Sequence, residues 1–273
     1  MLLILILNKF GNVMPTQQKL VSEKSLSRKL LDEKDQLRII IIGATSGIGL
    51  AIAHQYLDAG HLVGLTGRRE NLLHDIQLKY FGTAYVQMMD VSKAALASSQ
   101  LENLIVKMEG ADIVIVNAGV GFVNPKLKWE KQAQTIDVNI TGFTALSSTA
   151  MKYFLKRGKG HLVGISSIAG IRGSDLAPDY AASKAYVSNY LAGLRKKAIK
   201  AKLPICVTDV LPGFVDTPMG QSEQRFWVAS SDEAGKQIVS AIKKKRKVVY
   251  VTKRWRIIAW LMRLLPSWIY NRI

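Results

Sequence analysis

One cysteine occurs among the 273 residues of the sequence, which excludes an internal disulfide. This residue, Cys206, lies in the apolar run PICVTDVL, where we expect it to pack as a small hydrophobic side chain. The four histidines are His54, His61, His74 and His161, and their spacing is not that of a metal site. We therefore expect no metal, and we favour a reducing, cytoplasmic compartment.

Long hydrophobic runs are also missing. The N-terminal run MLLILIL has seven residues, whereas a helix that crosses a bilayer needs roughly 20. No basic segment precedes this run and no small-residue cleavage site follows it, so it does not resemble a signal peptide. Two interpretations stay open: a weak membrane anchor, or a start site placed too early, with Met14 as the first residue. We assign residues 1–36 to an N-terminal extension that is flexible or partly a start-site artefact.

Acidic residues are few, because the chain has 20 Asp and Glu against 38 Lys and Arg, a net charge of +18. The excess is uneven. The segment from Arg195 to the C-terminus holds 17 Lys and Arg and 5 Asp and Glu, which is +12 of the +18. This concentration of one sign indicates an anionic partner for the C-terminal part: a membrane surface, a nucleic acid or an acidic ligand.

The rest of the sequence has the composition of one folded domain, with 48% hydrophobic residues and no internal repeat. From residue 37, short β-branched runs alternate with amphipathic stretches of helix length. The predicted strands are RIIII, HLVGLT, AYVQMM, DIVIV, HLVGIS, PICVTDVL and KVVYV. This alternation predicts an α/β fold of the Rossmann type, a doubly wound, mostly parallel sheet of about seven strands with helices on both faces. We assign residues 37–252 to this domain and 253–273 to a basic amphipathic tail.

The first predicted strand leads directly into a glycine loop, GATSGIG. Its glycines allow a tight turn and a close approach of the backbone to a pyrophosphate, and the next helix supplies unpaired N–H groups and a positive dipole end. An ordinary strand-to-helix turn could contain the same glycines, but a position after the first strand of a βαβ unit favours a dinucleotide site. The predicted cofactor-binding residues here are Gly43, Thr45, Ser46, Gly47, Ile48 and Gly49.

The end of the second predicted strand, GLTGRRE, indicates which dinucleotide binds. A carboxylate at this point would bind a free ribose 2′-hydroxyl, whereas an arginine accommodates a 2′-phosphate. The chain has Arg68 and Arg69 here and no acid at the strand end. Two cations at a helix start are electrostatically misplaced unless an anion lies beside them. We therefore predict NADP rather than NAD, with two solvated surface arginines as the other interpretation.

Tyr180 and Lys184, in PDYAASK, are four residues apart, which places them on one face of a helix. A pair at this spacing is often only a surface pair. The motifs around it, however, resemble those of the short-chain dehydrogenase/reductase family from about residue 37 to 251. In chain order these motifs are GATSGIG, DVS, VNAG, DVNITG, ISSIAG, YAASK and LPGFVDTP.

The resemblance implies catalytic roles for Asn139, Ser167, Tyr180 and Lys184. In the direction of reduction, Tyr180 would donate a proton to the carbonyl oxygen as hydride arrives from the cofactor, and Ser167 would help hold the developing oxyanion. Lys184 would hold the nicotinamide ribose, and Asn139 a water that carries protons to Lys184. We expect the Lys184 ammonium and a positive nicotinamide ring to lower the pKa of Tyr180 from about 10.

The resemblance also extends the cofactor site beyond the glycine loop. The matching positions are Asp90 and Val91 beside the adenine, then Asn117, Ala118, Gly119, Tyr180, Lys184, Pro212, Gly213 and Thr217. Ile42 and Val116 depart from the family pattern, which commonly has threonine and asparagine there. Because the first and fourth strands are neighbours in this fold, we expect an apolar contact between these side chains in place of a polar one.

The C-terminal tail follows the last predicted strand as KRWRIIAWLMRLLPSWIYNRI, and KKKRK precedes that strand. From Arg254 to Leu265 we predict three helical turns that carry two tryptophans and three arginines. Their apolar run is too short to span a bilayer but suits a membrane interface. Packing on the same domain or on a second subunit is the alternative. We expect no nucleic-acid partner, because the aromatics do not form a stacking platform.

Together these observations predict an NADP(H)-dependent oxidoreductase that interconverts a ketone or aldehyde and an alcohol. The alternative is a dinucleotide-binding scaffold or sensor without turnover, against which the intact set of four candidate catalytic residues argues. Ile168, Ala169, Ile171 and the segment MGQSEQRFWV are expected to line an apolar substrate site, so a lipid, steroid-like or acyl substrate fits. The resemblance implies a homodimer or homotetramer, which we expect in the cytoplasm, either free or associated with a membrane.

Overall fold

The structure is a computed structural model that describes residues 35–219, 226–270 and 272. The interpretations of MLLILIL lie outside the described residues, as does the part of the expected substrate segment at residues 220–225.

Seven parallel strands form one sheet in the order β3-β2-β1-β4-β5-β6-β7. Their bounds are β1 (Arg38–Ile42), β2 (Leu62–Gly67), β3 (Ala84–Met88), β4 (Ile113–Val116), β5 (Gly160–Ile165), β6 (Ile205–Pro212) and β7 (Val248–Val251). Each lies within one residue of the predicted run. The predicted α/β fold is therefore confirmed.

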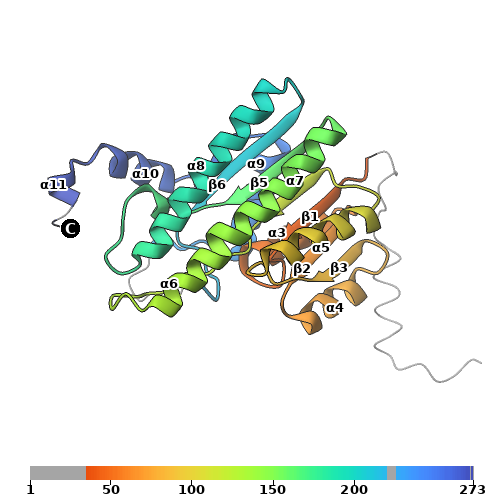
Figure 1. Ribbon diagram of the computed structural model, residues 1–273, viewed down its shortest axis with the longest axis horizontal. Coiled ribbons are helices and arrows are strands. Elements are labelled where there is room, and N and C mark those ends of the chain that lie inside the picture. The colour runs from red at the N-terminus through yellow and green to blue at the C-terminus, as the bar shows by residue number, and fades with distance from the viewer. Residues whose placement is uncertain (1–34, 220–225, 271, 273) are drawn as a thin grey trace, which may run out of the picture.

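Helices cover both faces of this sheet (Figure 1). One face carries α3 (Gly47–Asp58), α4 (Glu70–Lys79) and α9 (Ser231–Lys243), and the other carries α5 (Ala94–Lys107), α7 (Phe143–Arg157) and α8 (Pro178–Lys200). The shorter elements are α6 (Trp129–Ile136), the π-helix η1 (Asp137–Gly142), the 3-10 helix η2 (Ile168–Ile171), α10 (Trp255–Leu264) and α11 (Ser267–Tyr270). The predicted C-terminal helix is thus present as α10.

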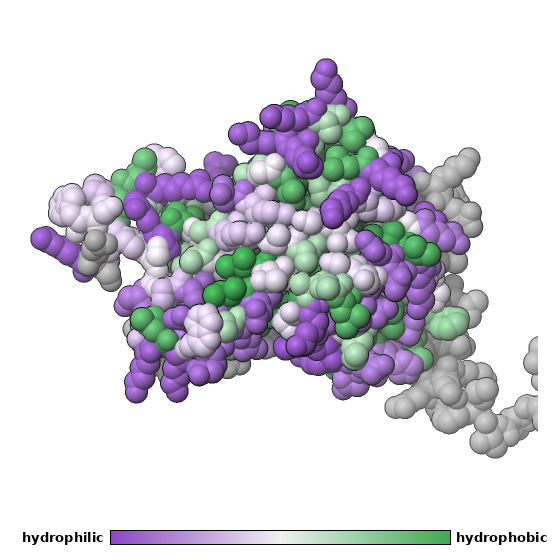
Figure 2. Space-filling model, viewed as in Figure 1, coloured by the Kyte–Doolittle hydropathy of each residue, from purple (hydrophilic) through white to green (hydrophobic). Residues whose placement is uncertain are grey.

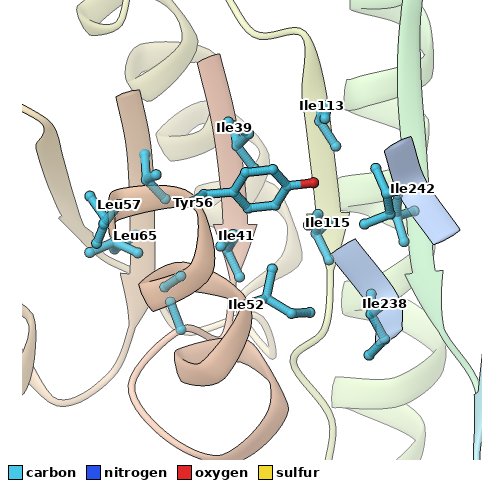
Figure 3. Packing of buried hydrophobic residues seen from close by; sticks show 14 of the residues in the cluster. Ile39, Ile41, Ile52, Tyr56, Leu57, Leu65, Ile113, Ile115, Ile238 and Ile242 are labelled. Atoms are coloured by element: carbon cyan, nitrogen blue, oxygen red, sulfur yellow. The ribbon is translucent and has the colours of Figure 1, made fainter. Parts of the chain in front are cut away.

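The core forms two layers because successive side chains of a strand point to opposite faces. Ile39 and Ile41 of β1 belong to the layer under α3, α4 and α9, and Ile40 and Ile42 to the layer under α5, α7 and α8. Figure 3 shows the first layer, where the ring of Tyr56 lies among isoleucines of β1 and β4. Burial on both faces explains why the inner strands are continuous apolar runs.

Ile42 and Val116, which depart from the family pattern, are direct neighbours. β1 pairs with β4 in a register that places the two residues opposite each other, and both lie in the same core layer with exposed fractions of 0% and 1%. The expected contact between two apolar side chains is therefore confirmed, and neither side chain is a buried polar group without its partner.

The strand order reverses at β1, because the chain passes from β3 on one side of β1 to β4 on the other. Ligands of such sheets bind beyond the carboxyl ends of the strands at this reversal point. The segments that follow β1, β4, β5 and β6 therefore meet at one edge of the sheet.

Candidate active site

The glycine loop after β1 is held against the segment that follows β4. Gly43 has a φ of +86°, and an added Cβ would lie 2.8 Å from the Cα of Ala118. Asn117 Nδ2 donates a 2.7 Å hydrogen bond to the carbonyl oxygen of Gly43. A Cβ at Gly49 would overlap that same carbonyl oxygen. The loop therefore tolerates only glycine at these points, and its backbone stays accessible for a close ligand.

The N-terminus of α3 is suited to an anion. Its N-cap residue, Ser46, makes no side-chain capping bond, and no acidic residue lies in the first turn. The first backbone N–H groups of a helix lack partners within the helix and carry its positive dipole end. Gly47 has a φ of +54°, and an added Cβ would lie 2.9 Å from Thr217 Cγ2, so the segment after β6 closes over this loop. A pyrophosphate fits this arrangement.

Arg69 connects the end of β2 to the glycine loop. Its Nη2 donates 2.7 Å hydrogen bonds to the hydroxyls of Thr45 and Ser46, and its Nε donates a 3.1 Å bond to Thr45. Arg68 and Arg69 are both exposed. Two guanidinium groups thus stand beside the loop, one of them held in place by two hydroxyls.

Asp90 follows β3, which lies two strands away from β1. Its Oδ1 accepts hydrogen bonds from the backbone N–H and the hydroxyl of Ser92, at 3.0 and 2.8 Å. Partial burial would raise the pKa of the Asp90 carboxyl, but the bonds from Ser92 and the charges of Arg68 and Lys93 lower it overall. Asp90 is therefore a fixed carboxylate close to Arg68.

Lys184 reaches from α8 to the end of β5. Its Nζ donates a 3.0 Å hydrogen bond to the carbonyl of Ile165 and lies 5.7 Å from the centroid of the Tyr180 ring. Burial lowers the pKa of Lys184 to about 8, and the charge of Asp209 acts in the opposite direction. The helical spacing of four residues thus places the amine beside the phenol, as the sequence predicts.

Ser167 lies close enough to Tyr180 to affect the acidity of its hydroxyl. Burial raises the pKa of Tyr180, and a hydrogen bond with Ser167 lowers it in part. We expected Lys184 and a positive nicotinamide ring to lower the pKa of Tyr180 together, but in the polypeptide by itself the pKa is raised. Desolvation of the phenolate outweighs the other effects on the pKa of Tyr180. Burial also lowers the pKa of Lys184, so its amine is protonated less readily.

Asn139 lies in the π-helix η1, an element that often marks a functional site. Its Oδ1 accepts a 2.8 Å hydrogen bond from the N–H of Val120, and its Nδ2 donates to the carbonyl of Val120 at 2.7 Å and to Ser183 Oγ at 3.0 Å. A Cβ on Gly119 would lie 3.2 Å from Asn139 Oδ1 and 3.3 Å from Lys184 Nζ. The side chains of Asn139 and Lys184 therefore both lie against Gly119, where a larger residue would be crowded.

A model of the short chain dehydrogenase family matches residues 38–228. The protein belongs to this family. The four candidate catalytic residues, the glycine loop and strands β1 to β6 all lie within the matched region of this short-chain dehydrogenase, and β7 follows it.

Two sequence relatives and one solved structure illustrate the range of the family. An uncharacterized oxidoreductase of Myxococcus xanthus is 34% identical over 186 residues, which cover 66% of this chain and 72% of that protein. The NADP-dependent 3-hydroxy acid dehydrogenase of Escherichia coli O6:H1 is 29% identical over 180 residues, covering 65% and 72%. A short-chain dehydrogenase/reductase of Burkholderia phymatum in complex with NAD is 20% identical with a TM-score of 0.74, covering 85% and 94%. The proteins similar to this chain thus include one named for NADP and one in complex with NAD.

The remaining predicted cofactor-site residues of the dehydrogenase pack against the core or lie beside Ser167. Ile48 and Val91 pack against the two core layers, and Gly213 packs against the indole of Trp255. The carbonyl of Pro212 accepts a 3.4 Å hydrogen bond from Ser167 Oγ, which itself accepts one from the N–H of Ala169. The residues after Ser167 form η2 and are partly buried.

Three polar residues of the site were not predicted from the sequence: Ser166, Ser183 and Asp209. Ser166 donates to Asp209 on the neighbouring strand β6, and Ser183 donates a 2.8 Å bond to the carbonyl of Tyr180 while accepting one from Asn139. For Asp209 a signal exists in the sequence, because an aspartate inside the apolar strand PICVTDVL has to be buried, and a buried acid requires partners.

In the described residues, no group of three His, Cys, Asp or Glu side chains could hold a metal ion.

Proposed function

We propose that this dehydrogenase interconverts a ketone or aldehyde and an alcohol with NADP(H). The observation that supports the reaction is the meeting of Tyr180, Ser167 and Lys184 beyond the carboxyl ends of β5 and β6. A dinucleotide-binding scaffold without turnover has no need for a hydroxyl pair beside a buried amine.

Each residue has a role that follows from its surroundings. Burial keeps the Tyr180 hydroxyl protonated at neutral pH, so it acts as the proton donor to a carbonyl oxygen in the direction of reduction. Ser167 donates a hydrogen bond to the same oxygen as negative charge develops there. The nicotinamide cofactor supplies the hydride. Lys184, when protonated, stabilises the phenolate that remains, and Asn139 orders the groups around Lys184.

NADP is the proposed cofactor because of the two arginines that follow β2. Arg69 is held by Thr45 and Ser46 at the edge of the glycine loop, and Arg68 lies beside it. No carboxylate is present at the end of β2 to accept a hydrogen bond from a ribose 2′-hydroxyl. A 2′-phosphate would accept charge-assisted hydrogen bonds from both guanidinium groups.

An apolar carbonyl compound, such as a lipid, steroid-like or acyl molecule, is the proposed substrate class. Ile168, Ala169 and Ile171 follow the catalytic serine, and Phe226 to Val228 are exposed by 42 to 51% beyond β6. Apolar side chains at the mouth of a site favour an apolar ligand. Assembly as a homodimer or homotetramer is also proposed, from the family resemblance alone.

Carbonyl reduction by purified protein with NADPH tests this function. Tyr180→Phe removes the proton donor but keeps the ring, so we expect kcat/KM to fall by about 100-fold or more while the Kd of NADPH changes by much less. Tyr186→Phe is the matched control, because Tyr186 lies on the same helix and its hydroxyl pairs with Thr144 at 2.7 Å, outside the site. NADPH binding without turnover of any carbonyl in a broad panel would favour the scaffold.

A further inference from the structure

Helix α10 has two apolar stripes rather than one. The first consists of Trp255, Ile258, Ala259 and Met262, at the spacing of residues that share one helix face. Trp255 and Ala259 have exposed fractions of only 2% and 0%. This stripe therefore packs on the protein.

The orientation of α10 is fixed by several contacts. The indole of Trp255 packs against Phe214 and Phe226, with ring centroids 5.5 and 5.0 Å apart. Arg172, which follows η2, donates hydrogen bonds to the carbonyls of Met262 and Leu265 at 2.8 and 2.6 Å. Because the helix is held at both ends, its second face points outward in a defined direction.

The second stripe consists of Ile257, Trp260, Leu261 and Leu264, again at the spacing of one helix face. These side chains are 48 to 61% exposed, and Trp268 of α11 is 64% exposed. The inner face of α10 already packs on the protein, so a second apolar face exposed to water does not stabilise the fold. An exposed group of large apolar side chains on one element indicates an interaction surface.

The charges around this outward stripe are of one sign. Arg254, Arg256 and Arg263 lie on α10 or directly before it and are exposed. Residues 234–273 contain eleven Lys and Arg and no Asp or Glu. Figure 2 shows hydrophobic and hydrophilic side chains next to each other over this end of the molecule, which lies at its edge in Figure 1.

We propose that the outward stripe of α10 docks on an anionic membrane surface. The apolar side chains would enter the interface between headgroups and acyl chains, where tryptophan is favoured, and the arginines would meet the lipid phosphates. Within the described residues, no helix is long and apolar enough to cross a membrane. The helix therefore lies in the plane of the surface.

A second copy of the chain is a poorer partner for this face. A two-fold contact would bring the arginines of one α10 close to those of the other, and like charges oppose such pairing. One stripe of four apolar side chains is also much smaller than the roughly 20–30 residues that each partner contributes to a stable protein interface. An anionic membrane offers acyl chains to the apolar side chains and phosphates to the arginines.

The docking helix also packs against the proposed substrate segment. Trp255, on the inner face of α10, contacts both Gly213 and the aromatic residues Phe214, Phe226 and Trp227. The docking surface and the segment after β6 thus lie on two sides of one helix. The docking itself does not depend on the proposed reaction.

Co-sedimentation of the full chain with vesicles tests this surface. We compare vesicles of phosphatidylcholine mixed with phosphatidylglycerol against phosphatidylcholine alone. The test variant is Trp260→Ser with Leu264→Ser, both positions being 60% exposed. The matched control is Trp129→Ser with Leu78→Ser, positions 66% and 57% exposed on α6 and α4. The thermal melting temperature shows that each variant is folded. Turnover of a water-soluble carbonyl with NADPH, measured without vesicles, reports on the proposed function separately.

We expect wild type and the control to bind the anionic vesicles, and the test variant to bind at least about tenfold more weakly, with binding decreasing as salt increases. Two results would overturn the proposal: no binding by wild type, or equal binding by wild type and the test variant. Equal binding would assign membrane attachment to another segment. No binding by wild type, together with a change of oligomeric mass in the test variant, would assign this face to a contact between copies.

Discussion

Ser166 donates a 2.5 Å hydrogen bond to the carboxylate of Asp209 where β5 and β6 lie side by side. Asp209 is 5% exposed. Burial raises its pKa, while Ser166, Ser188, Arg195 and Lys184 lower it in part. The charge of Asp209 in turn raises the pKa of Lys184, which burial lowers. We therefore expect Asp209 to act on the reaction through the protonation of Lys184, as a positioning residue.

The pH profile of kcat/KM tests this coupling. If Lys184 works as the ammonium, activity falls as the pH rises through about 8, where Lys184 loses its proton. Asp209→Asn removes a charge that raises the pKa of Lys184. We therefore expect the alkaline limb to move to lower pH. Asp112→Asn, at the opposite edge of the sheet, is the control. A limb that stays in place or moves to higher pH in Asp209→Asn contradicts the coupling.

Arg69→Gln tests the choice of cofactor. The substitution removes a guanidinium that would bind a 2′-phosphate, so we expect the Kd of NADPH to rise about 10- to 100-fold and that of NADH to change little. Fluorescence titration with both cofactors measures the ratio, and Arg256→Gln on α10 is the matched control. Equal losses for NADPH and NADH would mean that Arg69 serves only to hold Thr45 and Ser46.

Gly49→Ala tests the close packing of the glycine loop. The added methyl group would overlap the carbonyl oxygen of Gly43, so the loop and its bond to Asn117 have to shift. We expect the thermal stabilisation by NADPH to disappear. Gly193→Ala on α8 is the control, because an added Cβ there meets no atom within 4 Å, and alanine favours a helix by about 1 kcal/mol. A Gly49→Ala protein that NADPH stabilises as strongly as wild type would refute the packing argument.

Trp255→Ala tests whether α10 belongs to the folded unit. Trp255 is 2% exposed and packs against three aromatic rings, so we expect its removal to lower the free energy of unfolding by about 3–5 kcal/mol. Trp260→Ala is the matched control at a position that is 60% exposed, where we expect a change of less than about 1 kcal/mol. Urea unfolding measures both. Similar values for the two variants would show that α10 is only loosely attached.

Much of the site could be predicted because its chemistry is local in the sequence. The glycine loop, the two arginines after β2 and the Tyr180–Lys184 pair each depend on spacing within one turn or one loop. The bond between Asp209 and Ser166 could not be predicted in this way, since the residues are 43 positions apart and meet only when β5 and β6 pair. The raised pKa of Tyr180 in the polypeptide by itself could not be predicted for a related reason, because desolvation depends on everything packed around the phenol.

The sequence by itself determined the order and the limits of the strands, the position of the nucleotide loop and the presence of a C-terminal helix with arginines and tryptophans. These features follow from the periodicity of apolar residues and from the backbone requirements of glycine. Only the tertiary structure decided which stripe of α10 is buried, which is left facing outward, and how far the phenol and the amine are removed from water. Burial is a property of all neighbours together, and a linear sequence does not specify them.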